Sequence, residues 1–280
     1  MSNSAILATI YLVLGFALAI TLLVFWTRNR EDLRYYTRFG VYVACAFCAF
    51  SVVALAVAHF EQGLPMGFLV PAIGLVVDFF KITLVVAVGA YCARLSGYVA
   101  FPLIRPRLGL ELDAANGAVP HPVHAGTADL RTKAIWVAVL VLAWLGYSKL
   151  LFWLTSPEMA QPFQDMLNTL EMSQSMELTA TSALAVSAMA VSEELIFRLG
   201  IQNLLVRLFD WRGRQYWIAV LLTSLLWTIG HTGVLEPDWV KLLQIFPAGL
   251  ALGWLFRKHG IECCIAAHLL FNLIMPTLGL

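Results

Sequence analysis

Charged residues are scarce in this sequence. Only 12% of its 280 residues are Asp, Glu, Lys or Arg, and 60% are apolar. A water-soluble protein needs about 25% charged residues to cover its surface, so this composition excludes an ordinary soluble domain. The formal net charge is +1, which provides no basic surface for nucleic acid. The five cysteines form no pattern typical of a secreted disulfide framework.

Long uncharged runs dominate the sequence instead. A helix needs ~20 apolar residues to cross the hydrocarbon core of a bilayer, and these runs are of about that length. We therefore expect an all-α fold, a polytopic membrane helix bundle with about eight transmembrane helices. The expected spans are Ser4–Thr27, Phe39–His59, Met66–Ala93, Ala134–Leu154, Leu178–Val206, Tyr216–Gly233, Trp239–Phe256 and Cys263–Leu280.

The basic residues between these spans predict an orientation. Fourteen Lys and Arg lie in the connections 28–38, 94–133, 207–214 and 257–258, whereas the alternate connections hold one, Lys241. Because basic loops remain in the cytoplasm, both termini are expected outside. We expect an integral protein of a prokaryotic plasma (inner) membrane.

A stretch rich in Pro, Gly, His and Ala divides the chain. It predicts an irregular cytoplasmic linker, residues 106–133. The linker would separate an N-terminal three-helix membrane part, residues 1–105, from a five-span C-terminal membrane domain, residues 134–280.

Few charged side chains lie inside the expected spans, and some have a structural explanation. Asp78 and Lys81 are three residues apart on one helix face, so they can neutralise each other; a proton or ion path through Asp78 is the alternative. Lys149 lies near a helix end, from which its ammonium can reach water.

The remaining three charges lie together, in the segment Glu193-Glu194-Leu-Ile-Phe-Arg198. Ionisable groups inside a membrane are costly and mark a functional site by default. Glu194 and Arg198 have i,i+4 spacing, which predicts a structural ion pair. Glu193 points ~100° away on the helix and would face a polar cavity as a candidate general base.

Polar residues on two later spans can complete a site with Glu193. His231 ends one span, and His268 and Asn272 share one face of the last span. A carboxylate with an imidazole can deprotonate a water, and a second imidazole with an amide N–H can stabilise an oxyanion. These groups suit amide hydrolysis by direct attack of water.

These residues resemble the CPBP family of intramembrane proteases, which contains the CAAX prenyl endopeptidases and the bacterial Abi-type proteins. The family's motifs are two Glu followed by three residues and Arg, then Phe-x-x-x-His, then His-x-x-x-Asn or Asp. Here they read Glu193-Glu194-Leu-Ile-Phe-Arg198, Trp227-Thr-Ile-Gly-His231 and His268-Leu-Leu-Phe-Asn272. The resemblance covers roughly 134–280, and Trp227 departs from the usual Phe.

The resemblance assigns roles to these residues. It implies that Glu193 and His231 activate the water, that His268 and Asn272 form the oxyanion site, and that Glu194 and Arg198 support them. It leaves metal dependence open. A zinc ion held by Glu193, His231 and His268 is the alternative to metal-free glutamate catalysis, which we favour because no His-Glu-x-x-His helix is present.

The resemblance also implies the kind of substrate, a membrane protein or a lipidated or C-terminal-tail peptide in the lipid bilayer. Two other functions compete with the protease. One is a transporter or proton-coupled carrier that uses Asp78, Lys81 and the Glu pair. The other is a non-catalytic membrane scaffold of the same fold.

Overall fold

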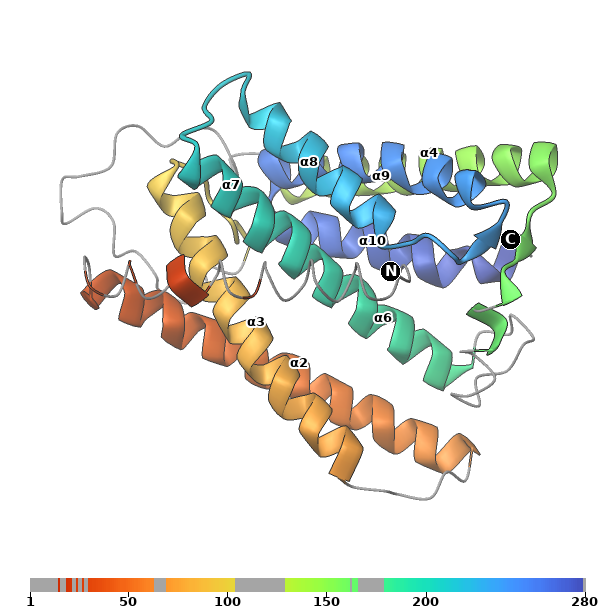
Figure 1. The fold of residues 1–280 in the computed structure, drawn as a ribbon, viewed down its shortest axis with the longest axis horizontal. Helices are drawn as coiled ribbons and strands as arrows, with labels where there is room; N and C mark the ends of the chain where they lie inside the picture. The colour runs from red at the N-terminus through yellow and green to blue at the C-terminus, as the bar shows by residue number, and fades with distance from the viewer. Residues whose placement is uncertain are drawn as a thin grey trace.

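The fold is a bundle of helices with almost no β-structure, as expected (Figure 1). The computed structural model describes residues 15, 19–21, 24, 27, 30–62, 69–103, 129–161, 163–165 and 179–278. Its helices are α2 (Arg30–Gln62), α3 (Leu69–Leu95), α4 (Leu130–Thr155), α6 (Ala180–Glu194), the π-helix η2 (Leu195–Gln202), α7 (Asn203–Leu208), α8 (Tyr216–Ile229), α9 (Asp238–His259), α10 (Ile261–Ile274) and the 3₁₀ turn η3 (Pro276–Leu278). Two short strands, β1 (Glu158–Met159) and β2 (Leu235–Glu236), pair antiparallel.

The described helices account for seven of the eight expected spans. Most of the first expected span, Ser4–Thr27, lies outside the described residues. Among the described residues, five helices are long and apolar enough to cross a membrane: Arg30–Glu61, Ala72–Leu95, Leu130–Thr155, Asp238–His259 and Ile261–Leu278. The expected span Leu178–Val206 is helical from Ala180 but is divided into α6, η2 and α7. Apolar side chains are widely exposed on the long helices, as in an integral membrane protein.

Sequence signals fix the beginnings and ends of several helices. Asp129 caps α4, because its carboxylate accepts a hydrogen bond from the Thr132 backbone N–H at 2.8 Å. Helix α4 thus begins inside the expected linker, most of which lies outside the described residues. Gly260 separates α9 from α10 with a φ of 91°, a left-handed conformation that suits glycine.

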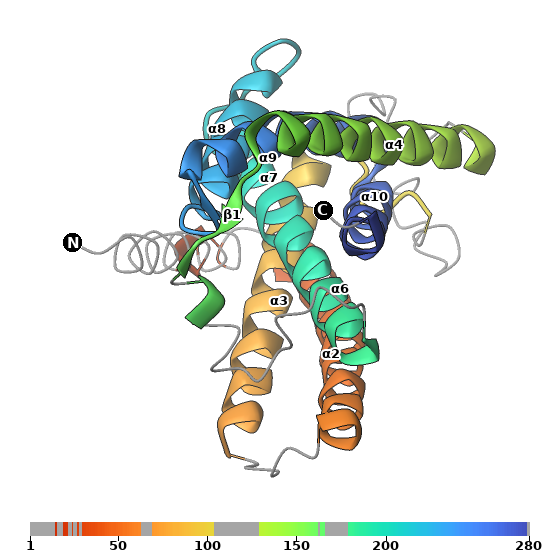
Figure 2. The same ribbon diagram turned by 90° about the vertical axis from the view of Figure 1, so that its right-hand side faces the viewer.

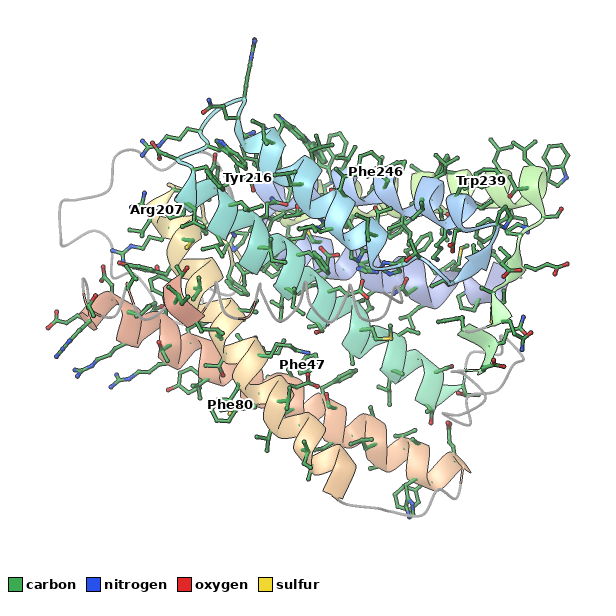
Figure 3. All side chains as sticks on the ribbon, in the orientation of Figure 1. Phe47, Phe80, Arg207, Tyr216, Trp239 and Phe246 are labelled. Carbon is green, nitrogen blue, oxygen red and sulfur yellow. The ribbon has the colours of Figure 1, made fainter. Side chains whose placement is uncertain are left out.

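The helices form two packed groups that share the segment from α6 to α7. Helices α2 and α3 form a pair on one side of this segment, and α4, α8, α9 and α10 lie on the other (Figures 1 and 2). Phe47 of α2 is 8% exposed in the core, whereas Phe80 of α3 lies at the outer surface (Figure 3). The segment that carries the two glutamates is therefore the central element of the bundle.

Close glycine contacts bring the helices around this segment together. A Cβ on Gly89 of α3 would lie 2.3 Å from the backbone oxygen of Leu199 in η2. On α9, a Cβ on Gly253 would lie 2.5 Å from Val220 of α8, and one on Gly249 would meet Trp227 at 3.2 Å. The Gly249-x-x-x-Gly253 pattern thus allows α9 to approach α8 closely.

Candidate active site

The two glutamates are the last residues of α6, where the regular helix gives way to a π-helix. The i→i+5 pattern of η2 begins at Leu195 and contains Arg198. Asn203 stabilises the return to α-helix, because its side-chain amide donates to the Leu199 carbonyl at 2.7 Å. The expected span Leu178–Val206 is thus helical from Ala180, and the sequence did not predict its π-helical segment. Segments of π-helix are rare and occur frequently at functional sites.

The predicted ion pair of Glu194 and Arg198 is present and fully buried. Arg198 Nε lies 3.4 Å from Glu194 Oε2, and the two side chains are 0% and 1% exposed. The other carboxylate oxygen, Oε1, lies 2.9 Å from His268 Nδ1. Since removing one partner of a buried pair leaves an uncompensated charge, Glu194 fixes both the guanidinium and the imidazole of α10.

Glu193 points elsewhere, toward two imidazoles and an indole. Its Oε2 accepts a hydrogen bond from Trp227 Nε1 at 2.7 Å. Its Oε1 lies 3.9 Å from His231 Nε2, and its Oε2 lies 4.0 Å from His268 Nε2. The two adjacent carboxylates thus point in different directions and have different neighbours, as the helix geometry predicts.

The orientation of His231 follows from a backbone contact. Helix α8 ends at Ile229, so His231 lies in the following turn rather than inside the expected span. Its Nδ1 lies 2.8 Å from the Trp227 carbonyl oxygen. A carbonyl only accepts hydrogen bonds, so Nδ1 carries the proton and Nε2 of the neutral ring has a free lone pair. That lone pair faces Glu193.

A cavity of about 90 Å³ brings the four predicted site residues together. Its lining residues are Trp144, Val186, Met189, Glu193, Trp227, His231, Lys241, Gln244, Ile245, His268, Phe271 and Asn272. A water occupies ~30 Å³ of liquid volume, so the cavity has space for a few waters beside the carboxylate. The structure brings Glu193, His231, His268 and Asn272 to one site, and their chemical roles stay predictions.

Aromatic rings enclose this cavity. Trp144 stacks on Phe271 with 3.7 Å between ring centroids, and its ring lies 5.8 Å from that of His268. Trp227 lies against both imidazoles, at 5.2 Å from His231 and 5.4 Å from His268. Trp144 has no sequence signal, because nothing distinguishes it from the other apolar residues of its span.

Lys241 also lines the cavity; it was counted above with the connections, although it is the third residue of the expected span Trp239–Phe256. It lies in the first turn of α9, which begins at Asp238. Its Nζ donates to Gln244 Oε1 at 3.0 Å, and Gln244 Nε2 donates to Ser148 Oγ of α4 at 3.0 Å. The i,i+3 spacing of Lys241 and Gln244 is visible in the sequence, but their direction toward Glu193 depends on tertiary packing.

The two structural explanations for charges in other spans are confirmed. Lys81 Nζ lies 2.5 Å from Asp78 Oδ1. The exposed ammonium of Lys149 donates to the Leu278 carbonyl at 3.2 Å. The Asp78–Lys81 pair also lines a second cavity of about 540 Å³, which Glu193 and Met189 share with the smaller one.

The atoms of the alternative zinc set are spaced more widely than the ligands around a bound zinc ion. Zinc ligands lie ~2.0–2.1 Å from the ion, so two ligand atoms in a tetrahedral site are separated by about 3.3 Å. Here Glu193 Oε1 lies 3.9 Å from His231 Nε2, and Glu193 Oε2 lies 4.0 Å from His268 Nε2. Within the described ranges no three His, Cys, Asp or Glu side chains are grouped so that they could hold a metal ion.

Comparison with known proteins finds sequence similarity in the second half of the chain. Residues 175–274 match the family model described as type II CAAX prenyl endopeptidase Rce1-like. The chain is 33% identical over 93 residues to the sporulation-killing factor biosynthesis protein SkfC of Bacillus subtilis (strain 168). This match covers 32% of the chain and 18% of that protein, so the chain spans about a fifth of its relative's length. No solved structure matches significantly. Residues 175–274 contain all three motifs, so the part of the chain that carries them is similar to the Rce1-like type II CAAX prenyl endopeptidases.

Proposed function

We propose that this protein is an intramembrane endopeptidase that hydrolyses a peptide bond with a water activated by Glu193 and His231. The observation that carries the proposal is that Glu193, His231, His268 and Asn272 all line one cavity. The match of residues 175–274 to the family model supports an endopeptidase. The mechanism and the substrate are our inference from the geometry.

The spacing of Glu193 and His231 suits the activation of one water. Their Oε1 and Nε2 atoms are 3.9 Å apart, so a water at hydrogen-bond distance from each can donate one proton to each. When this water attacks the scissile carbonyl carbon, one proton passes to Glu193 and the new C–O bond forms. The carbonyl π electrons move to the oxygen as an oxyanion. When the intermediate collapses, the C–N bond breaks and the proton passes to the leaving amine.

His268 and Asn272 are placed to stabilise the oxyanion. Glu194 accepts from His268 Nδ1 at 2.9 Å, and a carboxylate at this position stabilises an imidazolium. The imidazolium can donate from Nε2 into the cavity. The Asn272 carboxamide lines the same cavity and supplies N–H donors. Donors that are fixed before the reaction are worth ~10²–10³-fold in rate each.

The larger cavity suits a substrate that reaches the site from within the membrane. It lies between α2, α3 and the α6–η2 segment, and its wall is mainly apolar apart from the Asp78–Lys81 pair. Met189 and Glu193 line both cavities, so the two cavities lie next to each other. We propose a membrane protein or a lipidated or C-terminal-tail peptide as the substrate. A relative named for the biosynthesis of a killing factor agrees with processing of a membrane-associated peptide at a prokaryotic plasma membrane.

We further propose metal-free catalysis, because the carboxylate and imidazoles are spaced for a bridging water rather than for a shared metal ion. Cleavage by the purified protein should then be unchanged after prolonged dialysis against a strong chelator. Loss of cleavage on chelation, with recovery on adding one divalent metal, would contradict this part of the proposal.

The proposed activity is tested by the Glu193→Gln variant. Membranes from cells that express the wild type or the variant at equal levels are compared by proteomics of protein termini. We expect one or a few membrane polypeptides to accumulate uncut with Glu193→Gln and to be cut again when the wild type is restored. Identical termini in both membranes would reject the proposal.

A further inference from the structure

We propose that Lys241 is a further catalytic residue, whose ammonium supplies a stationary positive charge beside Glu193 and then beside the oxyanion. The proposal rests on the proposed hydrolysis and adds a group that the three family motifs do not contain. Its basis is the position of Lys241 on the wall of the 90 Å³ cavity and the hydrogen bonds that hold it there.

A buried hydrogen-bond chain holds the ammonium in place. Lys241 is half-buried, whereas Gln244 and Ser148 are 1% and 0% exposed. Gln244 accepts from Lys241 Nζ through its oxygen and donates to Ser148 Oγ through its nitrogen, with both distances 3.0 Å. Buried polar side chains are costly unless they are satisfied, and these two satisfy each other in a way that orients the ammonium.

Lys241 adds a positive charge to the cavity of Glu193, next to the imidazolium proposed for His268, whose Nε2 lies 4.0 Å from Glu193 Oε2. The ionisable groups that line the two cavities with Glu193 are His231, His268, Lys241, Asp78 and Lys81, and the buried pair Glu194–Arg198 lies outside both cavities. Arg198 is compensated by Glu194 at 3.4 Å and Lys81 by Asp78 at 2.5 Å. Within the part of the chain that the structure describes, no ion pair is recorded for Lys241. Its nearest acid in sequence, the exposed Asp238, binds the Gly233 N–H at 2.6 Å instead.

The proposed reaction moves one negative charge within reach of this ammonium. Before attack the charge lies on Glu193; when Glu193 takes the proton from water, the charge passes to the oxygen of the scissile carbonyl. Coulomb interactions are strong in a site of low dielectric constant, so a fixed cation that faces both positions lowers the cost of the intermediate. No charge enters or leaves the cavity in this step.

Replacement of Lys241 separates this role from a structural one. The substrate for this assay is the polypeptide that accumulates uncut in cells with the Glu193→Gln variant. The full chain is assayed in lipid nanodiscs. We expect Lys241→Met to lower kcat about 100-fold, the loss typical of one oxyanion donor, and to change KM by less than about threefold. Lys241→Arg keeps the charge and should recover at least ~10-fold of that loss. The matched control is Lys149→Met, which removes an exposed ammonium outside the cavity and should leave kcat unchanged.

A second variant tests the proposal independently of the folding of Lys241→Met. Gln244→Leu keeps the ammonium but removes its anchor, and we expect kcat to fall about 10-fold in protein that is still folded at the assay temperature. Full kcat in both Lys241→Met and Gln244→Leu would overturn the role of Lys241, while the proposed function would stand. Full activity of Glu193→Gln would instead overturn the proposed function itself.

Discussion

Trp227 connects the two groups proposed to activate the water. Its indole N–H donates to Glu193 Oε2 at 2.7 Å, and its backbone carbonyl accepts from His231 Nδ1 at 2.8 Å. The first contact depends on the side chain and the second does not. A phenylalanine, the usual residue in the family motif, could fill the same space but could not donate to the carboxylate.

Trp227→Phe should therefore lower activity without loss of the fold. A hydrogen bond to a charged group contributes ~1.5–3 kcal/mol, which corresponds to about 10- to 100-fold in kcat/KM. The measurement is kcat/KM in nanodiscs together with the unfolding temperature. Unchanged kcat/KM would show that the indole N–H is not needed to hold Glu193.

At the residue scale, helical spacing predicts some of the site and tertiary packing decides the rest. The i,i+4 spacing of Glu194 and Arg198 was enough to predict their pair and to direct Glu193 elsewhere. The contact of Glu194 with His268 could not be predicted, because it joins α6 to α10 across 74 residues. Lys241 was misplaced for a similar reason, since basic residues near helix ends usually reach water and only the fold turns this one inward.

At the scale of elements, the π-helix after Glu194 is held by close contact with α3. The Cβ that an alanine would add to Gly89 would lie 2.3 Å from the Leu199 oxygen, which is backbone and cannot move aside as a side chain can. Composition and hydropathy gave no sign of η2. Its formation depends on this contact and on the Asn203 side chain that binds the Leu199 carbonyl.

Gly89→Ala should destabilise the protein, because α3 or η2 must shift to remove the overlap. Overpacking in a close-packed core typically costs ~1–3 kcal/mol, and we expect a clearly lower unfolding temperature in detergent. Gly74→Ala on the same helix is the control, since an added Cβ there meets nothing within 4 Å. Equal unfolding temperatures for the two variants would show that α3 does not constrain η2.

The pair formed by α2 and α3 also forms one wall of the larger cavity. Ser51 of α2 faces this cavity, whereas Val53 of the same helix is 54% exposed. A bulky side chain at position 51 would therefore fill the cavity, whereas the same side chain at position 53 would point away from it.

Ser51→Trp should block the proposed path of the substrate. We expect kcat/KM to fall at least ~10-fold, the effect of about 1.4 kcal/mol of lost binding, mainly through KM. Val53→Trp adds the same side chain on the exposed face and should leave kcat/KM unchanged. Equal kcat/KM values for both variants would show that the substrate does not enter through this cavity.

At the scale of the whole molecule, apolar runs predicted the helices well. Seven expected spans correspond to described helices because burial in lipid requires long uninterrupted apolar segments. Helix boundaries were less accurate: α2 begins at Arg30 rather than Phe39, since charged residues can extend a helix beyond the hydrocarbon. How the helices pack could not be predicted, because it depends on close contacts between residues far apart in sequence.

The distribution of basic residues still predicts that both termini lie outside. A reporter enzyme that is active only outside the cytoplasm, fused after Leu280, should be active, and a protein that fluoresces only in the cytoplasm should stay dark at the same position. The reverse pattern would contradict the orientation, and with it any substrate model that depends on the side of the membrane.

The central claim is that two adjacent carboxylates have different tasks, chemistry for Glu193 and support for Glu194. The most direct measurement compares Glu193→Gln with Glu194→Gln for both cleavage rate and unfolding temperature. Glu193 is 22% exposed in the cavity, whereas Glu194 is 1% exposed beside Arg198.

We predict that Glu193→Gln lowers kcat by at least ~100-fold, as expected for loss of a general base, at an unchanged unfolding temperature. Glu194→Gln should lower the unfolding temperature, because a buried charge without its partner costs ~3–5 kcal/mol. Normal cleavage by Glu193→Gln, together with an inactive but fully stable Glu194→Gln, would contradict the account.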